Sequence, residues 1–315
     1  MKPAFFLAPA GRGQGLTTVA LGLVVALDRR GVRVSFYKPI SEDRGGESRP
    51  ERSTHFLRAT TTLAPADPLS LVEATKLVSS GRLDELLGKV VGTFEKSTQN
   101  ADLAILEGLL PSPDDPYRGS LNRELVKTLN GQVILVMGMA GRSVADLDDQ
   151  IEYAAKIYGG IDKILGLILN RCPIEDGDEI SNYLRNSRLF PRGDRLIGVI
   201  PHNELLTFCR AIDVQRHLNA TVIYPGEMES RRVKSMSMLA RTVPNLLHTL
   251  TPGAMLVTPA DRSDVILAVS MAALSRVPLS GLILTGDTDL DNRIVDFCGA
   301  AFATGLPLFR VMADS

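Results

Sequence analysis

A glycine-rich turn near the start of the chain combines residue types that hold phosphate groups. The apolar run from Ala4 to Ala8 leads into P-A-G-R-G-Q-G-L-T-T. Glycine lets backbone N–H groups approach an anion closely, and a helix opening at Leu16 adds free N–H groups and a positive dipole end. The sequence therefore predicts a phosphate-cradling loop. Its candidate anion-binding residues are Gly11, Gly13, Gly15, Thr17 and Thr18.

The same turn lacks the lysine that usually follows the last glycine of a P-loop. That motif places Lys and then Ser or Thr after the glycine, whereas here Leu16 follows Gly15. The cation that neutralises charge between β- and γ-phosphates is therefore missing. Two interpretations remain open: a relic that still binds a nucleotide or another anion, and a glycine turn kept only for packing a strand against a helix.

Three further polar residues stand at the carboxyl ends of predicted strands. They are Lys38, Glu107 and Asn170, which follow the apolar runs 32–37, 102–106 and 164–169. In an open parallel sheet this edge collects ligands. Lys38 could face phosphates, Glu107 could order Mg²⁺ or water, and Asn170 could read an adenine edge. The alternatives are a solvated loop lysine, a helix cap or surface acid, and a turn residue.

Apolar runs alternate with helical patterns over residues 1–215. Strands this uniformly apolar require a parallel sheet covered by helices on both faces. We predict an α/β domain with a doubly wound parallel sheet, and surface loops at the polar runs 41–52 and 111–119. The predicted strands are 4–8, 32–37, 102–106, 132–137, 164–169 and 196–200, and the predicted helices are 16–30, 53–60, 68–79, 83–99, 121–129 and 144–158.

Residues 216–315 predict a second, smaller α/β domain. We expect strands at 220–224, 254–258, 282–285 and 308–312, helices at 261–276 and 291–304, and an apolar helix broken at Pro244. Basic residues near the start of the helix at 261 could form an anion pocket, although a solvated basic edge is the alternative. The residues of this second candidate pocket are Arg231, Arg232, Lys234, Asp261 and Arg262.

The composition argues against several classes of function. With 35 basic and 36 acidic side chains, the chain has no overall field for nucleic acid or an anionic membrane. Three scattered cysteines indicate reduced thiols in a cytoplasmic compartment, and the four histidines lack metal-ligand spacing. No apolar run reaches the roughly 18 residues of a membrane span, and the N-terminus does not resemble a signal peptide. We assign no metal ligand and no catalytic residue.

The order of short motifs resembles the N-terminal region of the long bacterial phosphate acetyltransferases. The matching segments include A-P-A-G-R-G-Q-G-L-T-T, F-Y-K-P-I, L-I-L-N, V-T-P-A-D-R-S-D-V and I-L-T-G-D, and the resemblance runs from Lys2 to Met312. It implies a dethiobiotin-synthetase-like P-loop domain, then a DRTGG domain, whose name matches Asp261-Arg262 and Thr285-Gly286. The family's reaction, acetyl-CoA plus phosphate giving acetyl phosphate plus coenzyme A, resides in a further C-terminal domain.

The weaker resemblance to dethiobiotin synthetases concerns positions. Lys38, Glu107 and Asn170 match their K-P lysine, E-G acid and adenine-reading asparagine, whereas Leu16 replaces a lysine, and Ser53 and Thr54 stand where a magnesium-binding aspartate is expected. We expect a regulatory and oligomerisation region that binds a nucleotide or small anionic metabolite, requires no cofactor, and acts on an acetyltransferase domain in cis. Mg²⁺ is left open. The alternatives are an ATP-dependent ligase like dethiobiotin synthetase and a purely structural oligomerisation platform.

Overall fold

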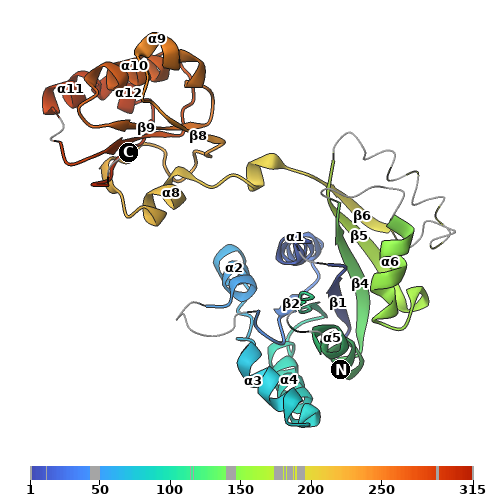
Figure 1. The fold of residues 1–315 in the computed structure, drawn as a ribbon. Coiled ribbons are helices and arrows are strands. Elements are labelled where there is room, and N and C mark those ends of the chain that lie inside the picture. The colour runs from blue at the N-terminus through green and yellow to red at the C-terminus, as the bar shows by residue number, and fades with distance from the viewer. Residues whose placement is uncertain are drawn as a thin grey trace. The chain divides into compact units, whose positions relative to one another are not determined.

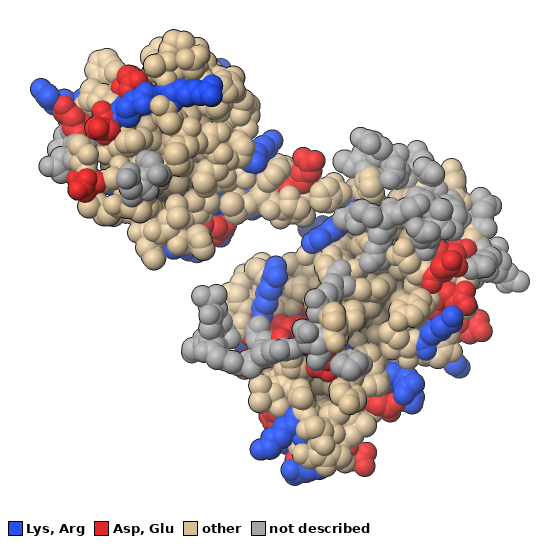
Figure 2. Space-filling view, in the orientation of Figure 1, with Lys and Arg blue, Asp and Glu red and all other residues tan. Residues whose placement is uncertain are grey.

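The chain forms two compact units, residues Met1–His202 and Asn203–Ser315, which are described separately. The structure is a computed structural model that describes residues 2–11, 13–42, 50–113, 115, 117–139, 147–173, 180, 182, 187, 189, 196–288 and 291–313. None of the described helices is long and apolar enough to cross a bilayer. On the face shown in Figure 2, the described acidic and basic side chains are intermingled.

A six-stranded parallel sheet forms the centre of the first unit. The strands lie in the order β2-β3-β1-β4-β5-β6. This arrangement confirms the predicted parallel α/β fold. The strands are β1 (Ala4–Pro9), β2 (Val34–Tyr37), β3 (Leu103–Glu107), β4 (Gly131–Gly138), β5 (Ile164–Cys172) and β6 (Leu196–Pro201).

Helices cover both faces of this sheet (Figure 1). On β1, Leu7 belongs to the apolar cluster beneath α1 and α2, whereas Phe6 belongs to the cluster beneath α3 to α6. Because neighbouring side chains of a strand point to opposite faces, the apolar runs of the sequence fill two cores. The helices are α1 (Leu16–Asp28), α2 (Arg52–Thr60), α3 (Leu71–Ser79), α4 (Leu83–Ser97), α5 (Tyr117–Thr128), α6 (Leu147–Lys156) and the 3₁₀ helix η2 (Ile161–Lys163).

Several boundaries differ from the sequence prediction. Strands β3 and β5 extend through Glu107 and Asn170, so both residues belong to the sheet and do not follow it. Helix α5 begins at Tyr117, inside the predicted loop 111–119, and residues 144–146 of the predicted helix 144–158 lie outside the described part. Strands β3 and β5 end later than predicted because residues with buried polar side chains continue the hydrogen-bonded ladder beyond the apolar run.

The second unit contains a five-stranded sheet in the order β7-β11-β10-β9-β8. Strand β7 is antiparallel to β11, and the other neighbours are parallel. The strands are β7 (Thr221–Tyr224), β8 (Ser235–Met238), β9 (Ala254–Pro259), β10 (Gly281–Thr285) and β11 (Leu308–Arg310), and the helices are η3 (Glu204–Leu206), α8 (Ala211–His217), α9 (Val243–Leu246), η4 (Leu247–Thr249), α10 (Ser263–Leu274), α11 (Asn292–Phe297) and α12 (Gly299–Phe302).

The prediction of an apolar helix broken at Pro244 was wrong. The segment holds the edge strand β8, whose S-M-S-M residues alternate, followed by a short helix α9 that carries Pro244 in its first turn. Proline is tolerated there because the first N–H groups of a helix have no intrahelical acceptor. The proline therefore starts this helix and does not interrupt it.

Burial of Tyr37 on β2 gives the first unit a predictable alkaline sensitivity. Its side chain is fully buried and lies against Phe94, and burial raises the pKa of Tyr37 to about 12. In the unfolded chain a tyrosine ionises near pH 10, so the unfolded state loses its proton first as the pH rises. We expect the free energy of unfolding to fall between pH 10 and pH 12, by roughly 2 kcal/mol from this group.

Urea unfolding between pH 9 and pH 12 measures this effect. Tyr37→Phe should flatten the decline, whereas Tyr153→Phe should leave it unchanged, because the Tyr153 side chain is 75% exposed. An equal slope in Tyr37→Phe and the wild type would contradict the assignment.

Candidate functional site

The glycine loop between β1 and α1 is held by hydrogen bonds to two neighbouring strands, β4 and β5. Gly13 and Gly15 have φ angles of +68° and +72°. The buried Gln14 side chain accepts a hydrogen bond from the Gly138 N–H at the end of β4. Asn170, on β5, donates its amide to the Gln14 carbonyl at 2.8 Å. The Asn170 amide, predicted to read an adenine edge, therefore holds the loop.

Gly15 caps the N-terminus of α1 without any side-chain hydrogen bond. A Cβ atom at Gly15 would lie 2.4 Å from the Asn170 Nδ2 atom, so only glycine fits there. The first N–H groups of a helix have no intrahelical acceptor, and no capping side chain takes the place of one here. The start of α1 therefore keeps the donors and dipole that favour an anion.

Leu16 occupies the position of the usual P-loop lysine and points into the core. Its side chain is 4% exposed and belongs to the apolar cluster that includes Leu7, Val19 and Val136. A charged side chain at this position would lose its water without gaining a partner. The absence of a cation at this position is therefore part of how α1 packs against the sheet.

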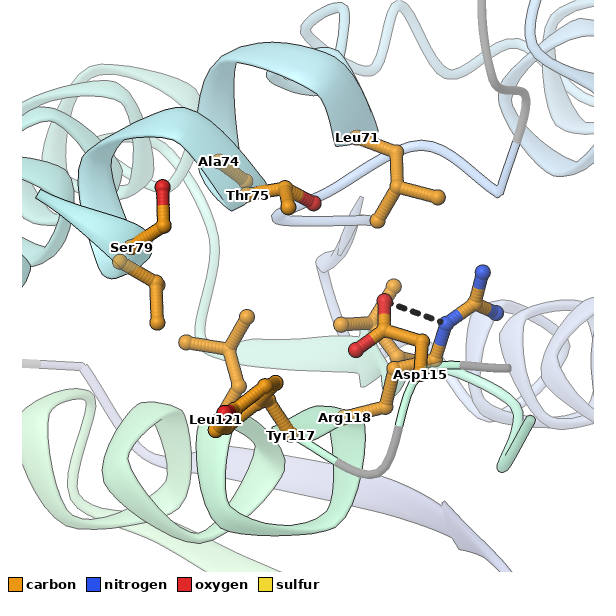
Figure 3. A pocket seen from close by; sticks show the side chains of 10 residues that line it. Leu71, Ala74, Thr75, Ser79, Asp115, Tyr117, Arg118 and Leu121 are labelled. Atoms are coloured by element: carbon orange, nitrogen blue, oxygen red, sulfur yellow. Dashed lines mark hydrogen bonds and ion pairs between the residues drawn. The ribbon is translucent and has the colours of Figure 1, made fainter. Parts of the chain in front are cut away.

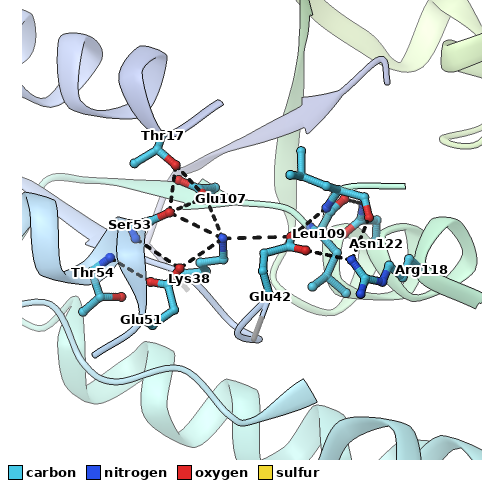
Figure 4. A network of polar contacts seen from close by, with 11 residues as sticks. Thr17, Lys38, Glu42, Glu51, Ser53, Thr54, Glu107, Leu109, Arg118 and Asn122 are labelled. Atoms are coloured by element: carbon cyan, nitrogen blue, oxygen red, sulfur yellow. Dashed lines mark hydrogen bonds and ion pairs between the residues drawn. The ribbon is translucent and has the colours of Figure 1, made fainter. Parts of the chain in front are cut away.

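Lys38 lies in a buried polar cluster beside the start of α1 (Figure 4). Its Nζ atom is 2.7 Å from Glu107 Oε1, 3.4 Å from Glu51 Oε1 and 4.0 Å from Glu42 Oε1. Lys38 is 2% exposed and Glu107 is 3% exposed. The alternatives of a solvated lysine and a surface acid were therefore wrong for both residues.

Thr17 connects this cluster to the glycine loop. Its Oγ1 atom lies 2.8 Å from Ser53 Oγ and donates to Glu107 Oε1 at 3.3 Å. Ser53 in turn donates to Glu107 Oε1 at 2.7 Å. The structure thus brings Thr17, Lys38 and Glu107 together, whereas Thr18 is exposed on α1 and Gly11 and Gly13 lie in the loop itself.

Sequence reasoning missed Glu51 and Glu42, because both stand in the hydrophilic run 41–52 that was predicted to be a surface loop. Glu51 is buried and caps α2 by accepting from the N–H groups of Ser53 and Thr54 at 3.1 and 2.8 Å. Glu42 accepts from Arg118 at 2.7 Å. Residues 43–49 lie outside the described part. An acid directly before a helix was the one available signal, and it identifies only a cap.

Burial and ion pairing shift the pKa values of Glu107, Glu51 and Lys38 in opposite directions. Burial raises the pKa of Glu107, and Lys38 and Ser53 only partly oppose it. Burial would also raise the pKa of Glu51, but Lys38 and the two N–H donors outweigh burial, so the pKa of Glu51 is lowered. Burial would lower the pKa of Lys38, yet Glu107 and Glu51 together raise it. Lys38 is therefore a protonated counter-ion for carboxylates.

This arrangement limits the chemistry of the cluster. The Lys38 ammonium lies against the carboxylate that was considered as a Mg²⁺ ligand. Within the described residues, no group of three or more His, Cys, Asp or Glu side chains could hold a metal ion. The Glu107 Oε2 atom is buried and accepts no hydrogen bond from any residue that the structure describes. Lys38 pairs with the carboxylates of its own cluster and is not presented to a ligand.

Arg171 is a cation that sequence reasoning missed. It follows Asn170 on β5, is exposed, and has a φ of +56°, which is uncommon outside glycine. Its Nε atom lies 3.8 Å from the position that a Cβ atom at Gly15 would take. Within the described part of the chain its guanidinium makes no hydrogen bond or ion pair. An unpaired positive charge therefore stands beside the glycine loop.

The three arginines of the second predicted pocket are engaged elsewhere. Arg231 donates to the carbonyl groups of Leu279 and Thr304, and Arg262 pairs with Asp264 at 2.8 Å. Arg232 donates to the Phe208 carbonyl at 3.1 Å, and Lys234 and Asp261 are exposed. Within residues 203–288 and 291–313, no hydrogen bond or ion pair joins Arg231, Arg232 or Lys234 to Asp261 or Arg262.

Comparisons with known proteins match the whole chain. The family model described as an AAA domain matches residues 3–210, and that of the DRTGG domain matches residues 213–315. The phosphate acetyltransferase of Pseudomonas aeruginosa is 39% identical over 322 residues, covering 99% of this chain and 46% of the relative. The Escherichia coli phosphate acetyltransferase is 35% identical over 338 residues, covering 100% of this chain and 47% of the relative. The chain spans about half the length of these relatives, and the predicted resemblance is confirmed.

The matching solved structures are more distant in sequence. A ParA family ATPase from Chlorobium tepidum has a TM-score of 0.39 at 17% identity, covering 64% of this chain and 85% of its own. The regulatory region of a Clostridium perfringens pyrophosphatase, with CBS and DRTGG domains and bound diadenosine tetraphosphate, has a TM-score of 0.29 at 18% identity. That match covers 36% of this chain and 46% of the other.

Proposed function

Because the chain belongs to the AAA domain family and corresponds to the N-terminal part of phosphate acetyltransferases, we propose that it is the regulatory and assembly region of such an enzyme. The glycine loop binds a nucleotide or a small anionic metabolite as effector. The whole protein converts acetyl-CoA and phosphate into acetyl phosphate and coenzyme A in a further domain in cis. The chain associates with copies of itself.

One observation carries the effector proposal: the loop keeps its donors while its catalytic cation is gone. Gly15 leaves the start of α1 without a capping side chain, and Arg171, whose guanidinium has no partner among the described residues, lies beside it. Leu16 is buried in the core, and Lys38 is buried against Glu107 and Glu51. These features support reversible anion binding and not phosphoanhydride cleavage.

An ATP-dependent ligase would need Lys38 to replace the missing lysine. To reach a phosphate, Lys38 would have to leave its contacts of 2.7 Å with Glu107 and 3.4 Å with Glu51. Absence of one preorganised charge lowers a catalytic rate by about 10² to 10³. We therefore expect no ATP turnover by this chain, and turnover abolished by Lys38→Ala would favour the ligase instead.

Thermal unfolding with added inorganic phosphate, ATP or a three-carbon carboxylate tests the effector proposal. A ligand that binds only the folded state stabilises it by about 2.7 kcal/mol at a hundred times its dissociation constant. We expect at least one of these anions to raise the midpoint at millimolar concentration. Arg171→Gly should weaken that binding about tenfold or more, because a hydrogen bond to a charged group is lost.

Arg276→Gly is the matched control. Arg276 is also an exposed arginine with a positive φ, of +64°, but it lies in the second unit. Both substitutions relieve the same backbone strain, so both should leave stability unchanged or higher, and only Arg171→Gly should affect the anion. If none of the anions stabilises the wild type, the effector proposal fails and the structural platform is left.

A further inference from the structure

A pocket of about 320 Å³ lies between α3 and α5 in the first unit (Figure 3). Its floor is apolar and buried: Ala74 is 0% exposed, Leu109 2%, Leu71 5% and Leu121 8%. Small-molecule sites are concavities of this kind, with a volume of about 300 Å³ or more, apolar walls and a few polar groups. None of the described residues of the glycine loop lines it.

The polar end of the pocket consists of Asp115 and Arg118. Asp115 Oδ2 accepts from Arg118 Nε at 3.3 Å, whereas Oδ1 accepts no hydrogen bond from the described residues. In Figure 3 the Asp115 carboxylate extends from the α5 side towards the space beneath α3. A carboxylate with one oxygen unused is a strong acceptor for a charged donor.

Charge at this end of the pocket is negative. Arg118 Nη1 already donates to Glu42 Oε2 at 2.7 Å and to the Leu110 carbonyl at 3.1 Å, and Arg118 Nε donates to Asp115. Glu42 also lies 4.0 Å from Lys38, which is paired with Glu107 and Glu51, so among the described residues four carboxylates share two cations. Nη2 is the one guanidinium nitrogen of Arg118 without a hydrogen bond among the described residues, and a ligand carboxylate that reached it would lie beside the Asp115 and Glu42 carboxylates. A ligand ammonium would balance the excess charge and pair with Asp115 Oδ1.

We propose that this pocket binds a small apolar molecule that carries one ammonium group. The apolar body lies on the leucine floor between α3 and α5, and the ammonium donates to Asp115. Tyr117, 66% exposed on α5, stands at the rim, where its ring can cover the ligand and face the cation. The site is separate from the glycine loop and does not depend on the function proposed for it.

Calorimetric titration of the whole chain with three probes of similar size tests the charge. Phenethylamine carries the ammonium, 2-phenylethanol is neutral, and 3-phenylpropionate carries a carboxylate. We expect phenethylamine to bind about tenfold more tightly than the alcohol, because a charge-assisted hydrogen bond is roughly twice as strong as a neutral one, and the acid to bind most weakly. Equal affinities for the three probes, or no binding of phenethylamine at 10 mM (roughly the weakest affinity that the titration resolves), would overturn the proposal.

Two variants locate the site. Asp115→Asn should reduce the preference for the amine over the alcohol to about twofold or less, while the alcohol still binds. Thr75→Phe, which fills the pocket from an exposed position on α3, should abolish binding of both. Val72→Phe is its control, because Val72 is 56% exposed on the same helix and does not line the pocket. Amine binding unchanged in both Asp115→Asn and Thr75→Phe, at unchanged melting temperatures, would show that the amine binds elsewhere.

Discussion

Lys38→Met is expected to lower the free energy of unfolding of the first unit by about 3–5 kcal/mol. The side chain of Lys38 is 3% exposed and that of Glu107 2%, and 2.7 Å separates the charged atoms. Removal of the ammonium leaves two buried carboxylates, Glu107 and Glu51, without their shared counter-ion. A buried charge without a partner costs more than the pair itself contributes. Urea unfolding at pH 7 measures the loss.

The dependence of this loss on pH separates charge from packing. Without Lys38, Ser53 and Thr17 are left among the described residues to oppose the effect of burial on Glu107, so its folded pKa rises further. The folded state then binds a proton that the unfolded state releases above about pH 4.3. The variant should therefore recover stability as the pH falls from 7 towards 5, and Lys38→Met/Glu107→Gln should recover part of it at pH 7.

Lys89→Met supplies the control. Lys89 Nζ lies 2.7 Å from Glu73 Oε1, the same distance as in the buried pair, but these side chains are 43% and 42% exposed. Exposed pairs contribute about 0–1 kcal/mol, so this variant should lose little. A similar small loss for Lys38→Met would show that the buried cluster does not depend on its lysine.

The glycine loop and the sheet edge could be predicted because each rests on a local pattern. Parallel strands bring their carboxyl ends to one edge, so Lys38, Glu107 and Asn170 were placed correctly in relation to the loop. What the sequence could not show is which groups these side chains contact. Asn170 reaches the backbone of Gln14, and Lys38 turns inward to carboxylates.

The missed residues depend on contacts between distant parts of the chain. Glu51 stands in a hydrophilic run, yet its burial follows from the position of α2 beside Lys38. Strand β8 is a four-residue alternation of Ser and Met, too short to indicate a strand by itself, and it pairs with β9. Arg171 is conspicuous only through its backbone angle and its nearness to Gly15. Such pairings are tertiary, and single-sequence patterns do not contain them.

Gly15→Ala is expected to destabilise the first unit by about 2–4 kcal/mol and to weaken the binding of any anion at the loop. Two costs add. A left-handed φ of +72° is unfavourable for alanine, and the new Cβ would lie 2.4 Å from Asn170 Nδ2. To avoid that overlap, Asn170 must release the Gln14 carbonyl, which lies in the interior of the loop. Thermal and urea unfolding measure the first effect, and anion titration measures the second.

Gly31→Ala isolates the overlap from the backbone strain. Gly31 has a φ of +78°, and nothing lies within 4 Å of its Cβ position, so alanine there carries only the left-handed penalty of about 1–2 kcal/mol. The additional loss at Gly15 then measures the contact with Asn170. In a double-mutant cycle, Gly15→Ala/Asn170→Ala should be less destabilised than the sum of the two single variants, because alanine at 170 removes the colliding amide. If the losses at Gly15 and Gly31 are equal and the cycle is additive, the Asn170 amide moves aside without an energetic cost. The Asn170 contact then does not determine the shape of the loop, and the hydrogen bond between Gly138 and Gln14 is the contact that does.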